Sequence, residues 1–385
     1  MDVDVQTEFP PTCDLSLRVI NHQENFVGEA LHISGSFNNW PSEHEFLGHI
    51  PPVGQSLERK LTQIPIGHLQ LKLSRGSWDT VAVSETGYIE NVFEGEVPAA
   101  GVVELHIHRW RDQFPKSTAS PQVHILDPYF FFPELGRYKK VWIYLPKAYH
   151  QSKQSYPVLY MHDGQHLFDQ ATAKGRSGPV EWQVDETIDA SDRPCIVVAI
   201  DHAETWDERK KEYSVYSELD DPSLGRDYLY DIWHTLKPFV DSNYRTKKGR
   251  SHTAMVGSSL GAMITWYSGL TYSHLLAHVG VFSPSLWLHP SPFLADLQHH
   301  LTRSRDTFRE SDWFFYMGGE EFRRNPDGSL WHMQSAFEPV KAMLKHQFVG
   351  RTKVHTEPGA KHGPQYWQNA FRLFYQHLNH SSFFN

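Results

Sequence analysis

The sequence predicts an α/β domain with a mostly parallel sheet, preceded by a small all-β domain. Short alternating runs fill residues 1–112, whereas apolar strand-like runs alternate with helix-like segments over residues 122–385. The chain has 385 residues, 39% of them hydrophobic, which suits two domains with at least one large core. The polar segment 113–121 contains Pro and Ser without periodicity and is the expected linker.

The first domain is expected to be an antiparallel β-sandwich. Its predicted strands cover residues 15–20, 30–34, 68–73 and 102–107. Clusters of Gly, Pro and Asn separate these runs, and this pattern is typical of a small sandwich of the Ig-like type.

The second domain is expected to have strands that are buried on both faces. These strands are predicted over residues 140–145, 157–161, 195–200, 253–256, 278–282 and 313–317, and a further strand-like segment covers 352–356. Near-continuous apolar strands are typical of a parallel sheet covered by helices on both sides. Helices are expected between and after them, for example over 228–239 and 366–377.

Composition excludes several classes of function. The net charge is −9 with both signs interspersed, which disfavours nucleic acid as a partner. The sequence contains no run of about eighteen apolar residues, so no membrane span is expected. The acidic N-terminus does not resemble an export signal. Cys13 and Cys195 are expected to be free thiols, so a cytoplasmic location is predicted. Nothing in the sequence indicates the oligomeric state or a cofactor.

The segment from Gly257 to Gly261 reads Gly-Ser-Ser-Leu-Gly between an apolar run and a helix-like segment. This is the pattern of a nucleophile elbow, in which small residues two before and two after a serine leave its Oγ exposed. Ser259 is therefore the candidate nucleophile; the alternative is an ordinary Gly/Ser turn. A helix that starts behind Ser259 would favour an oxyanion there.

A serine hydroxyl needs a base, and in α/β-hydrolases the acid and then the histidine follow the serine along the chain. His362 follows the predicted strand 352–356 and precedes a helix, which makes it the candidate base; His355, inside the strand, is the weaker rival. Glu320 and Glu321 follow the strand that ends at Met317, and Glu321 is the preferred acid. A Ser-His dyad without an acid remains open.

The oxyanion hole needs two backbone N–H groups. The amide of Leu260 is one candidate, and the amide of Gln165, in the loop after strand 157–161, is the other. His162 and His166 have a spacing that zinc ligands use, but no third ligand accompanies them at metal spacing, so no metal site is expected.

Four motifs resemble an esterase family that groups esterase D-like enzymes, enterochelin esterases and feruloyl esterases, all serine hydrolases of α/β-hydrolase fold. They are 161–169, Arg209 with Glu212 and Tyr213, 257–261, and 282–287. The resemblance covers roughly residues 123–380 and appears in the family's order. It implies that Ser259 is the nucleophile, His362 the base and the 320–321 turn the acid. Ala262 departs from the family, whose members commonly have a second glycine there.

Substrate contacts are expected from Arg209, Tyr213 and Trp287. The aromatic residues Tyr213 and Trp287, with Trp182 and Trp206, would suit an aryl ester if they lie at the mouth of the site. Alternatively, they could be core residues. Arg209 could meet an anionic substrate, but a pair with Glu212 is favoured.

The first domain resembles the glycogen-binding module of the AMP-activated protein kinase beta subunit, through residues 32–40, 64–73 and 76–78. The resemblance implies that Trp40, Trp78 and Lys72 grip an α-glucan, with indole faces stacked on the sugar. The alternative is that both tryptophans are structural.

The sequence thus predicts a serine hydrolase that cleaves a small-molecule carboxylic ester through an acyl-enzyme. A siderophore, a feruloyl ester or an acyl-sugar is the expected substrate. The alternative is a glucan-binding or scaffolding protein with a vestigial hydrolase domain.

Overall fold

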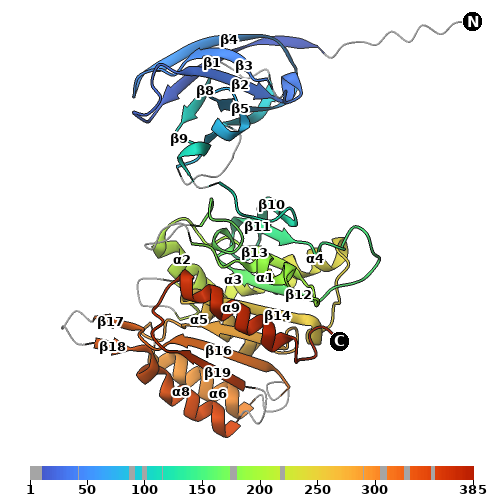
Figure 1. The fold of residues 1–385 in the computed structure, drawn as a ribbon, viewed down its shortest axis with the longest axis vertical. Coiled ribbons are helices and arrows are strands. Elements are labelled where there is room, and N and C mark those ends of the chain that lie inside the picture. Colours follow the sequence, from blue (N-terminus) through green and yellow to red (C-terminus); the bar gives the residue numbers. More distant parts are fainter. Residues whose placement is uncertain are drawn as a thin grey trace, which may run out of the picture. The chain divides into compact units, whose positions relative to one another are not determined.

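The chain divides into two compact units, Met1–Ser117 and Thr118–Asn385, which we describe separately in a computed structural model (Figure 1). The described residues are 11–41, 43–85, 92–97, 102–114, 116–173, 180–216, 222–288, 290–303, 310–324, 330–347 and 352–385. The division falls inside the predicted linker. The amides of Thr118 and Ser120 donate to Asp169 (3.1 Å) and Asp185 (2.7 Å), so the second half of that segment is anchored to the second unit.

The first unit consists of two main sheets that share one apolar core. Its strands are β1 (Thr12–Asn21), β2 (Ala30–Gly35), β3 (Glu45–His49), β4 (Ser56–Pro65), β5 (Gly67–Ser74), β6 (Ala82–Val83), β7 (Phe93–Val97), β8 (Val102–Ile107) and β9 (Arg109–Trp110). The sheet orders are β4-β1-β8 and β3-β2-β5-β7, and a separate ladder joins β6 to β9. Alternate residues of both sheets, such as Leu17 of β1 and Leu71 of β5, are fully buried in the common core.

The expectation of a purely antiparallel sandwich is wrong at one pair. β1 and β8 are parallel neighbours, with Ile20 opposite His106. These strands stand near the two ends of the unit's sequence. Turn signals report only on strands that follow each other directly, whereas a parallel pair needs a long connection.

The second unit is built on one eight-stranded sheet in the order β10-β11-β13-β12-β14-β15-β16-β19 (Figure 1). Its strands are β10 (Val123–Phe132), β11 (Arg137–Tyr144), β12 (Val158–His162), β13 (Ile196–Ile200), β14 (Thr253–Ser258), β15 (His278–Phe282), β16 (Asp312–Gly318) and β19 (Thr352–Glu357), with a separate hairpin of β17 (Phe322–Arg324) and β18 (Leu330–His332). The first two pairs, β10 with β11 and β11 with β13, are antiparallel, and the other pairs are parallel. The mostly parallel sheet of the predicted α/β fold is thus confirmed.

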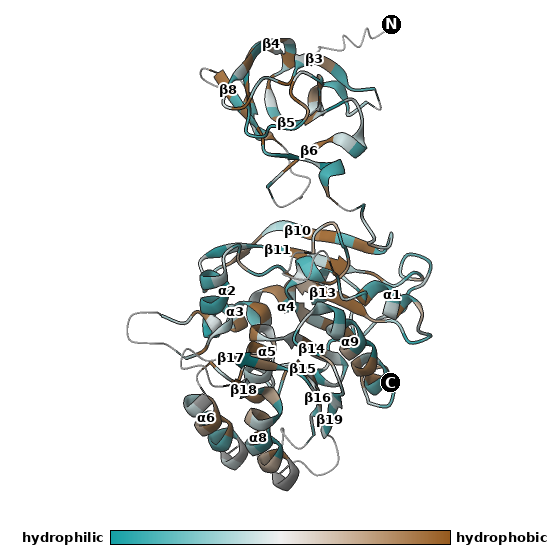
Figure 2. Cartoon of the chain, turned by 60° about the vertical axis from the view of Figure 1, so that its left-hand side comes forward, coloured by the Kyte–Doolittle hydropathy of each residue, from teal (hydrophilic) through white to brown (hydrophobic). Residues whose placement is uncertain are grey.

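Helices cover both faces of this sheet, as the alternation of side chains along β16 shows. Phe315 contacts Trp266 of α5 (Leu260–Thr271) and Phe337 of α8 (Met333–Gln347), whereas Phe314 contacts Phe374 of α9 (Pro364–Leu378). Successive residues of a strand point to opposite faces, so both must be apolar. Figure 2 shows that α2 (Trp206–Tyr213), in contrast, is hydrophilic over most of its length.

The described helices are α1 (Val184–Asp189), α2 (Trp206–Tyr213), α3 (Gly225–Asp231), α4 (Lys237–Asn243), α5 (Leu260–Thr271), α6 (Pro290–Arg303), α8 (Met333–Gln347) and α9 (Pro364–Leu378). The helix predicted over 228–239 is interrupted by a π-helical turn, Ile232–Leu236, between α3 and α4. Among the described residues, no helix combines the length and the apolar character that crossing a membrane requires.

Candidate active site

A sharp turn joins β14 to α5, and Ser259 is the single residue between them. Ser259 has φ 56° and ψ −117°, a strained conformation for a residue with a side chain. Small residues are required on both sides: a Cβ on Gly257 would lie 2.4 Å from the carbonyl oxygen of Gly261, and one on Gly261 would lie 3.1 Å from Asp163 Oδ2. The predicted strand, turn and helix around Ser259 are therefore confirmed.

Three side chains form a continuous hydrogen-bonded relay at this turn. Ser259 Oγ lies 3.0 Å from His362 Nε2, and His362 Nδ1 lies 2.9 Å from Glu321 Oε2. The relay comes together because β14, β16 and β19 run parallel, so that the segments following them meet at one edge of the sheet.

The structure distinguishes the candidate acids and bases between which the sequence could not decide. The side chain of Glu320 is exposed and makes no hydrogen bond to His362. Its backbone N–H donates to the Ala360 carbonyl at 2.9 Å. His355 stays within β19, where its ring stacks on Tyr316 with centroids 5.8 Å apart. Glu321, which is 4% exposed, is the carboxylate bonded to His362.

The acid is held by partners that the sequence analysis did not assign. Glu321 Oε1 accepts hydrogen bonds from the Gly318 amide (2.7 Å) and from Ser283 Oγ (2.5 Å). Trp367 Nε1 in turn donates to Ser283 Oγ at 3.1 Å. These bonds leave Oε2 directed at His362 and fix the imidazole in one tautomer. The feature of the sequence that could have indicated Ser283 is the Ser-Pro-Ser run directly after β15.

Ser285 is a second missed residue. It is fully buried, and its Oγ lies 3.0 Å from Ser259 Oγ. If Ser259 donates to a neutral His362, Ser285 is the donor to Ser259. This arrangement keeps the Ser259 proton directed at the imidazole.

The loop after β12 lies beside the turn at Ser259. Asp163 has φ 59° and precedes the 3-10 turn Gly164–His166, so the amide of Gln165 belongs to the first turn and has no partner within it. The amide of Leu260 is likewise the first of α5. Gln165 is fixed at both ends, because its carbonyl accepts from Thr172 Oγ1 (2.8 Å) and its side-chain oxygen accepts from the His202 amide (3.2 Å).

A buried ion pair holds this loop against α2. Arg209 donates from Nε and Nη2 to the two carboxylate oxygens of Asp163, each at 2.8 Å, and Tyr213 Oη accepts from the Asp163 amide at 3.3 Å. Burial alone would raise the pKa of Asp163, but the Arg209 guanidinium holds that pKa well below its ordinary value. Asp163 is therefore ionised, and α2 is fixed to the loop although it presents few apolar residues.

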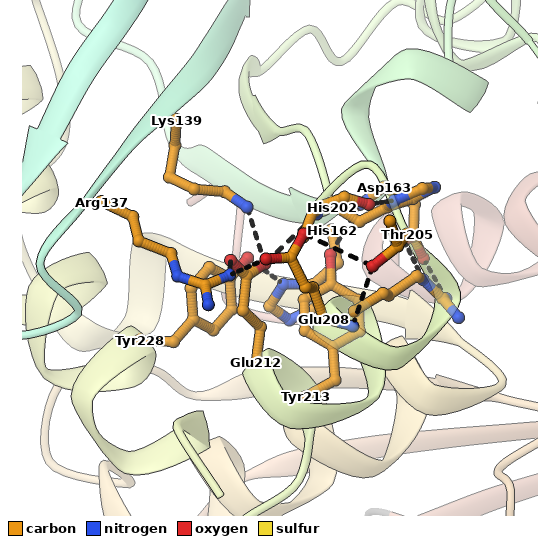
Figure 3. A network of polar contacts seen from close by, with 12 residues as sticks. Arg137, Lys139, His162, Asp163, His202, Thr205, Glu208, Glu212, Tyr213 and Tyr228 are labelled. Atoms are coloured by element: carbon orange, nitrogen blue, oxygen red, sulfur yellow. Dashed lines mark hydrogen bonds and ion pairs between the residues drawn. The ribbon is translucent and has the colours of Figure 1, made fainter.

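The predicted pair of Arg209 with Glu212 is wrong. Glu212 is fully buried and instead accepts from Lys139 Nζ (2.7 Å) and Arg137 Nη1 (3.0 Å), both from β11 (Figure 3). Arg209 and Tyr213 are 9% and 1% exposed, and both face the Asp163 loop. Both residues position that loop, and the direct substrate contact expected of them stays a prediction.

Removing the guanidinium of Arg209 should destabilise the second unit strongly. Arg209→Met leaves the Asp163 carboxylate buried without its partner, and such a loss costs about 3–5 kcal/mol in the free energy of unfolding. Arg137→Met is the matched control, because Glu212 keeps Lys139 and the Arg137 side chain is 31% exposed. The control should cost about 1 kcal/mol or less in urea unfolding. Equal losses in the two variants would show that Asp163 does not depend on Arg209.

His162 and His166 do not converge on a common point. His162 is buried, and its Nδ1 lies 2.9 Å from Tyr228 Oη, whereas His166 Nε2 lies 3.3 Å from His202 Nε2. Burial lowers the pKa of His162 to about 4, with a smaller contribution from the Arg209 charge opposed by Asp163. His162 is thus a neutral structural residue at neutral pH.

Acidification should destabilise the second unit through His162. The unfolded chain binds this proton near the ordinary histidine pKa of about 6.5, whereas the folded chain binds it only near 4. The free energy of unfolding should therefore fall by up to about 3 kcal/mol as the pH decreases from 6.5 to 4, through this residue alone. His162→Gln, which keeps a hydrogen-bonding group but does not titrate, should lose this part of the slope. An unchanged slope in urea unfolding would refute the assignment.

Comparison with known proteins agrees with this geometry. The family described as "Putative esterase" matches residues 133–372. The chain belongs to this esterase family. It is 24% identical over 242 residues to the Bacillus subtilis protein YbbA, which is described as uncharacterized; the match covers 60% of this chain and 89% of YbbA.

Two solved structures share the fold of the esterase unit. The BES protein from Bacillus cereus has a TM-score of 0.53 and 18% identity, and siderophore hydrolase EstB from Aspergillus nidulans has a TM-score of 0.52 and 17% identity. Each match covers 68% of this chain and 97% of the other. These structures confirm the α/β-hydrolase fold, and the family match shows that the chain is a carboxylic ester hydrolase.

The aromatic residues of the esterase differ in exposure. Trp182 is 2% exposed and packs on Phe282 and Trp367, so it is a core residue. Trp206, at the start of α2, is 53% exposed. Trp287 is half-buried, follows Ser285 by two residues, and carries the Arg323 guanidinium 3.6 Å from its ring centroid. Of the three predicted substrate-binding residues, Trp287 keeps an accessible surface.

Trp40 and Trp78 of the first unit form a pair outside its core. The rings of Trp40 and Trp78 have centroids 6.1 Å apart, and His44 contacts the edge of Trp78. Trp78 is 39% exposed, Trp40 is partly buried, and Trp110 is the fully buried tryptophan of this unit. Lys72 lies on β5 opposite Ser34 of β2, the strand that leads to Trp40.

Proposed function

We propose that the esterase works through an acyl-enzyme on Ser259. Ser259 Oγ attacks the ester carbonyl carbon while His362 Nε2 takes its proton, and the imidazolium then donates that proton to the leaving alcohol as the carbon–oxygen bond breaks. Water attacks the acyl-enzyme with the same histidine as base, and this step releases the acid and restores Ser259. The relay of Ser259, His362 and Glu321, with contacts of 3.0 and 2.9 Å, is the observation that carries this proposal.

The amides of Leu260 and Gln165 are the proposed oxyanion hole. Both belong to first helical turns that lie next to Ser259, and amides of this kind have no intrahelical acceptor. The bidentate Arg209–Asp163 pair supports the proposal, because it fixes the loop that carries Gln165. Glu321 stabilises the imidazolium that forms in each step.

An ester with an aryl group is the proposed substrate. Trp287 and the neighbouring Arg323 offer an accessible aromatic face with a cation, which suits an aryl acid that carries oxygen substituents. One structure of the same fold is that of a siderophore hydrolase, EstB from Aspergillus nidulans. A panel of catecholate siderophore, feruloyl, acetyl-sugar and thiol esters tests this. Aryl esters should give the highest kcat/KM, and Trp287→Ala should reduce that preference without affecting a short acetyl ester. A preference for acetyl-sugars or thiol esters would refute the aryl assignment.

The Trp40 and Trp78 pair is proposed as a glucan-binding surface, assisted by Lys72. Its support is that neither ring belongs to the core of the first unit, so both indoles can stack on sugar. The vestigial-hydrolase alternative is disfavoured because the relay at Ser259 is complete.

Trp40→Ala combined with Trp78→Ala should abolish retention on a glycogen or amylose column and leave small-ester turnover unchanged. The melting temperature should change little, whereas truncating core tryptophans costs about 3–5 kcal/mol each. Trp110→Ala is the matched control, because Trp110 is fully buried and should lower the melting temperature. A parent chain that is not retained would rule out the binding role.

A reducing compartment such as the cytoplasm is also proposed. Cys13 and Cys195 are both free, and Cys195 is fully buried. Burial raises the pKa of the Cys195 thiol to about 12, so this cysteine is unreactive.

A further inference from the structure

Three histidines gather on the outer face of the first unit, where β1 and β8 end. His106 lies in β8, and His108 directly follows that strand, two residues after His106, so both point to the same side. His22 directly follows β1, the parallel neighbour of β8, and its amide donates to the Ile107 carbonyl at 3.0 Å. The inward residues of both strands are buried, and all of them except Asn21 are apolar, so strand alternation places all three imidazoles outside.

The ring nitrogens of these histidines are close enough to share one ion. His22 Nε2 lies 2.9 Å from His106 Nδ1, and one nitrogen from each of the three rings lies within 4.8 Å of the others. A fourth donor is near, because Glu85 Oε1 lies 3.9 Å from His108 Nδ1. Tetrahedral zinc with Zn–N distances of about 2.0–2.1 Å requires ligand nitrogens roughly 3.3 Å apart. The cluster is therefore within a small rearrangement of that geometry.

We propose that His22, His106 and His108 bind a divalent first-row transition metal such as Zn²⁺, with Glu85 as the fourth ligand. Imidazole nitrogen is a preferred ligand of zinc, copper and nickel, and three histidines in or directly after two paired strands limit the conformational freedom lost on binding. The neighbouring cation on this face does not oppose the metal strongly, because Arg18 is paired with Glu58 (2.8 Å) and Glu104 (3.0 Å). The sequence-based expectation of no metal site considered only His162 and His166.

The three imidazole rings form a stack. The His22 ring is nearly parallel to the His106 and His108 rings, with interplanar angles of 19° and 5°. A metal lies in the plane of each imidazole that binds it, so the rings must turn about χ2. His22 is exposed and His108 is partly buried, which leaves room for that rotation.

Equilibrium dialysis and calorimetric titration of the full-length chain with Zn²⁺ test the proposal. The chain should bind one equivalent at this site. His106→Ala and His22→Ala should each weaken the binding roughly tenfold or more, because loss of a ligand costs at least as much as loss of a group that supports one. His49→Ala is the matched control: His49 is also an exposed histidine at the end of a strand in this unit, and its removal should leave the affinity unchanged.

Titration with Co²⁺ gives a second readout that does not depend on activity. A tetrahedral site of nitrogen and oxygen ligands should produce visible absorption that is stronger than that of the hydrated ion, and His106→Ala should remove it. Melting temperatures in the absence of metal verify that the variants fold. Less than one equivalent of bound Zn²⁺, or the same affinity in His106→Ala, His22→Ala and the parent chain, would overturn the proposal.

Discussion

Ser259→Ala should reduce ester hydrolysis by about a thousandfold or more. The hydroxyl forms the covalent bond to the acyl group, and no neighbouring side chain can replace it: His362 Nε2 and Ser285 Oγ both contact Ser259 Oγ at 3.0 Å and act through it. The relevant quantity is kcat for a chromogenic short-chain ester. A fall in kcat with nearly unchanged substrate binding is expected, because the bond to Ser259 forms only during the reaction.

The fold should survive this change. Ser259 contributes one hydroxyl at a strained turn, so alanine should leave the melting temperature close to that of the parent chain. Ser258→Ala is the control, since Ser258 precedes the turn and is buried in β14. Near-normal turnover by pure Ser259→Ala, or an equal loss of turnover in Ser258→Ala, would disprove the role of Ser259.

Glu321→Gln should reduce kcat by roughly 10³- to 10⁴-fold, while Glu320→Gln should leave it unchanged. Only Glu321 bonds to His362 (2.9 Å), whereas the side chain of Glu320 is exposed. An amide at position 321 can place its NH₂ against His362 and stabilise the wrong tautomer, and it cannot stabilise the imidazolium. The two substitutions are chemically identical and adjacent, so their comparison isolates the contact with the imidazole.

Other outcomes for this pair have clear meanings. If both variants retain the parent rate, the enzyme operates as a Ser-His dyad. If Glu320→Gln is the slower variant, the acid is misassigned. Thermal unfolding of both variants separates these results from a general loss of structure, because Glu321 also accepts from Gly318 and Ser283.

The parts of the site that sequence could predict are those encoded by local spacing. Gly257, Ser259 and Gly261 specify the turn at β14 by themselves, since only small residues fit its close backbone contacts. His362 and Glu321 were found because each follows a predicted strand, and the ends of parallel strands meet at one edge. Choosing Glu321 over Glu320 required the direction of a side chain on a sharp turn, which spacing does not give.

The contacts that could not be predicted join residues that are distant in sequence. Arg209 was expected to pair with its helical neighbour Glu212, but it pairs with Asp163, and Glu212 pairs with Lys139. Both pairs are buried, where an unpaired charge is costly, so tertiary packing decided the partners. The parallel pairing of β1 with β8 also joins segments that are distant in sequence, so local patterns could not predict it.

The most direct measurement is intact-mass spectrometry of the full-length chain after treatment with a fluorophosphonate, which phosphorylates serines activated as nucleophiles. The expected result is one adduct per chain, on the peptide that contains Ser259, with ester hydrolysis lost in proportion to labelling. Ser259→Ala should remain unlabelled, and Glu321→Gln should be labelled far more slowly than Glu320→Gln. Full ester hydrolysis by an enzyme labelled on Ser259, or inactivation through an adduct on another residue while Ser259 stays unmodified, would contradict the acyl-enzyme mechanism.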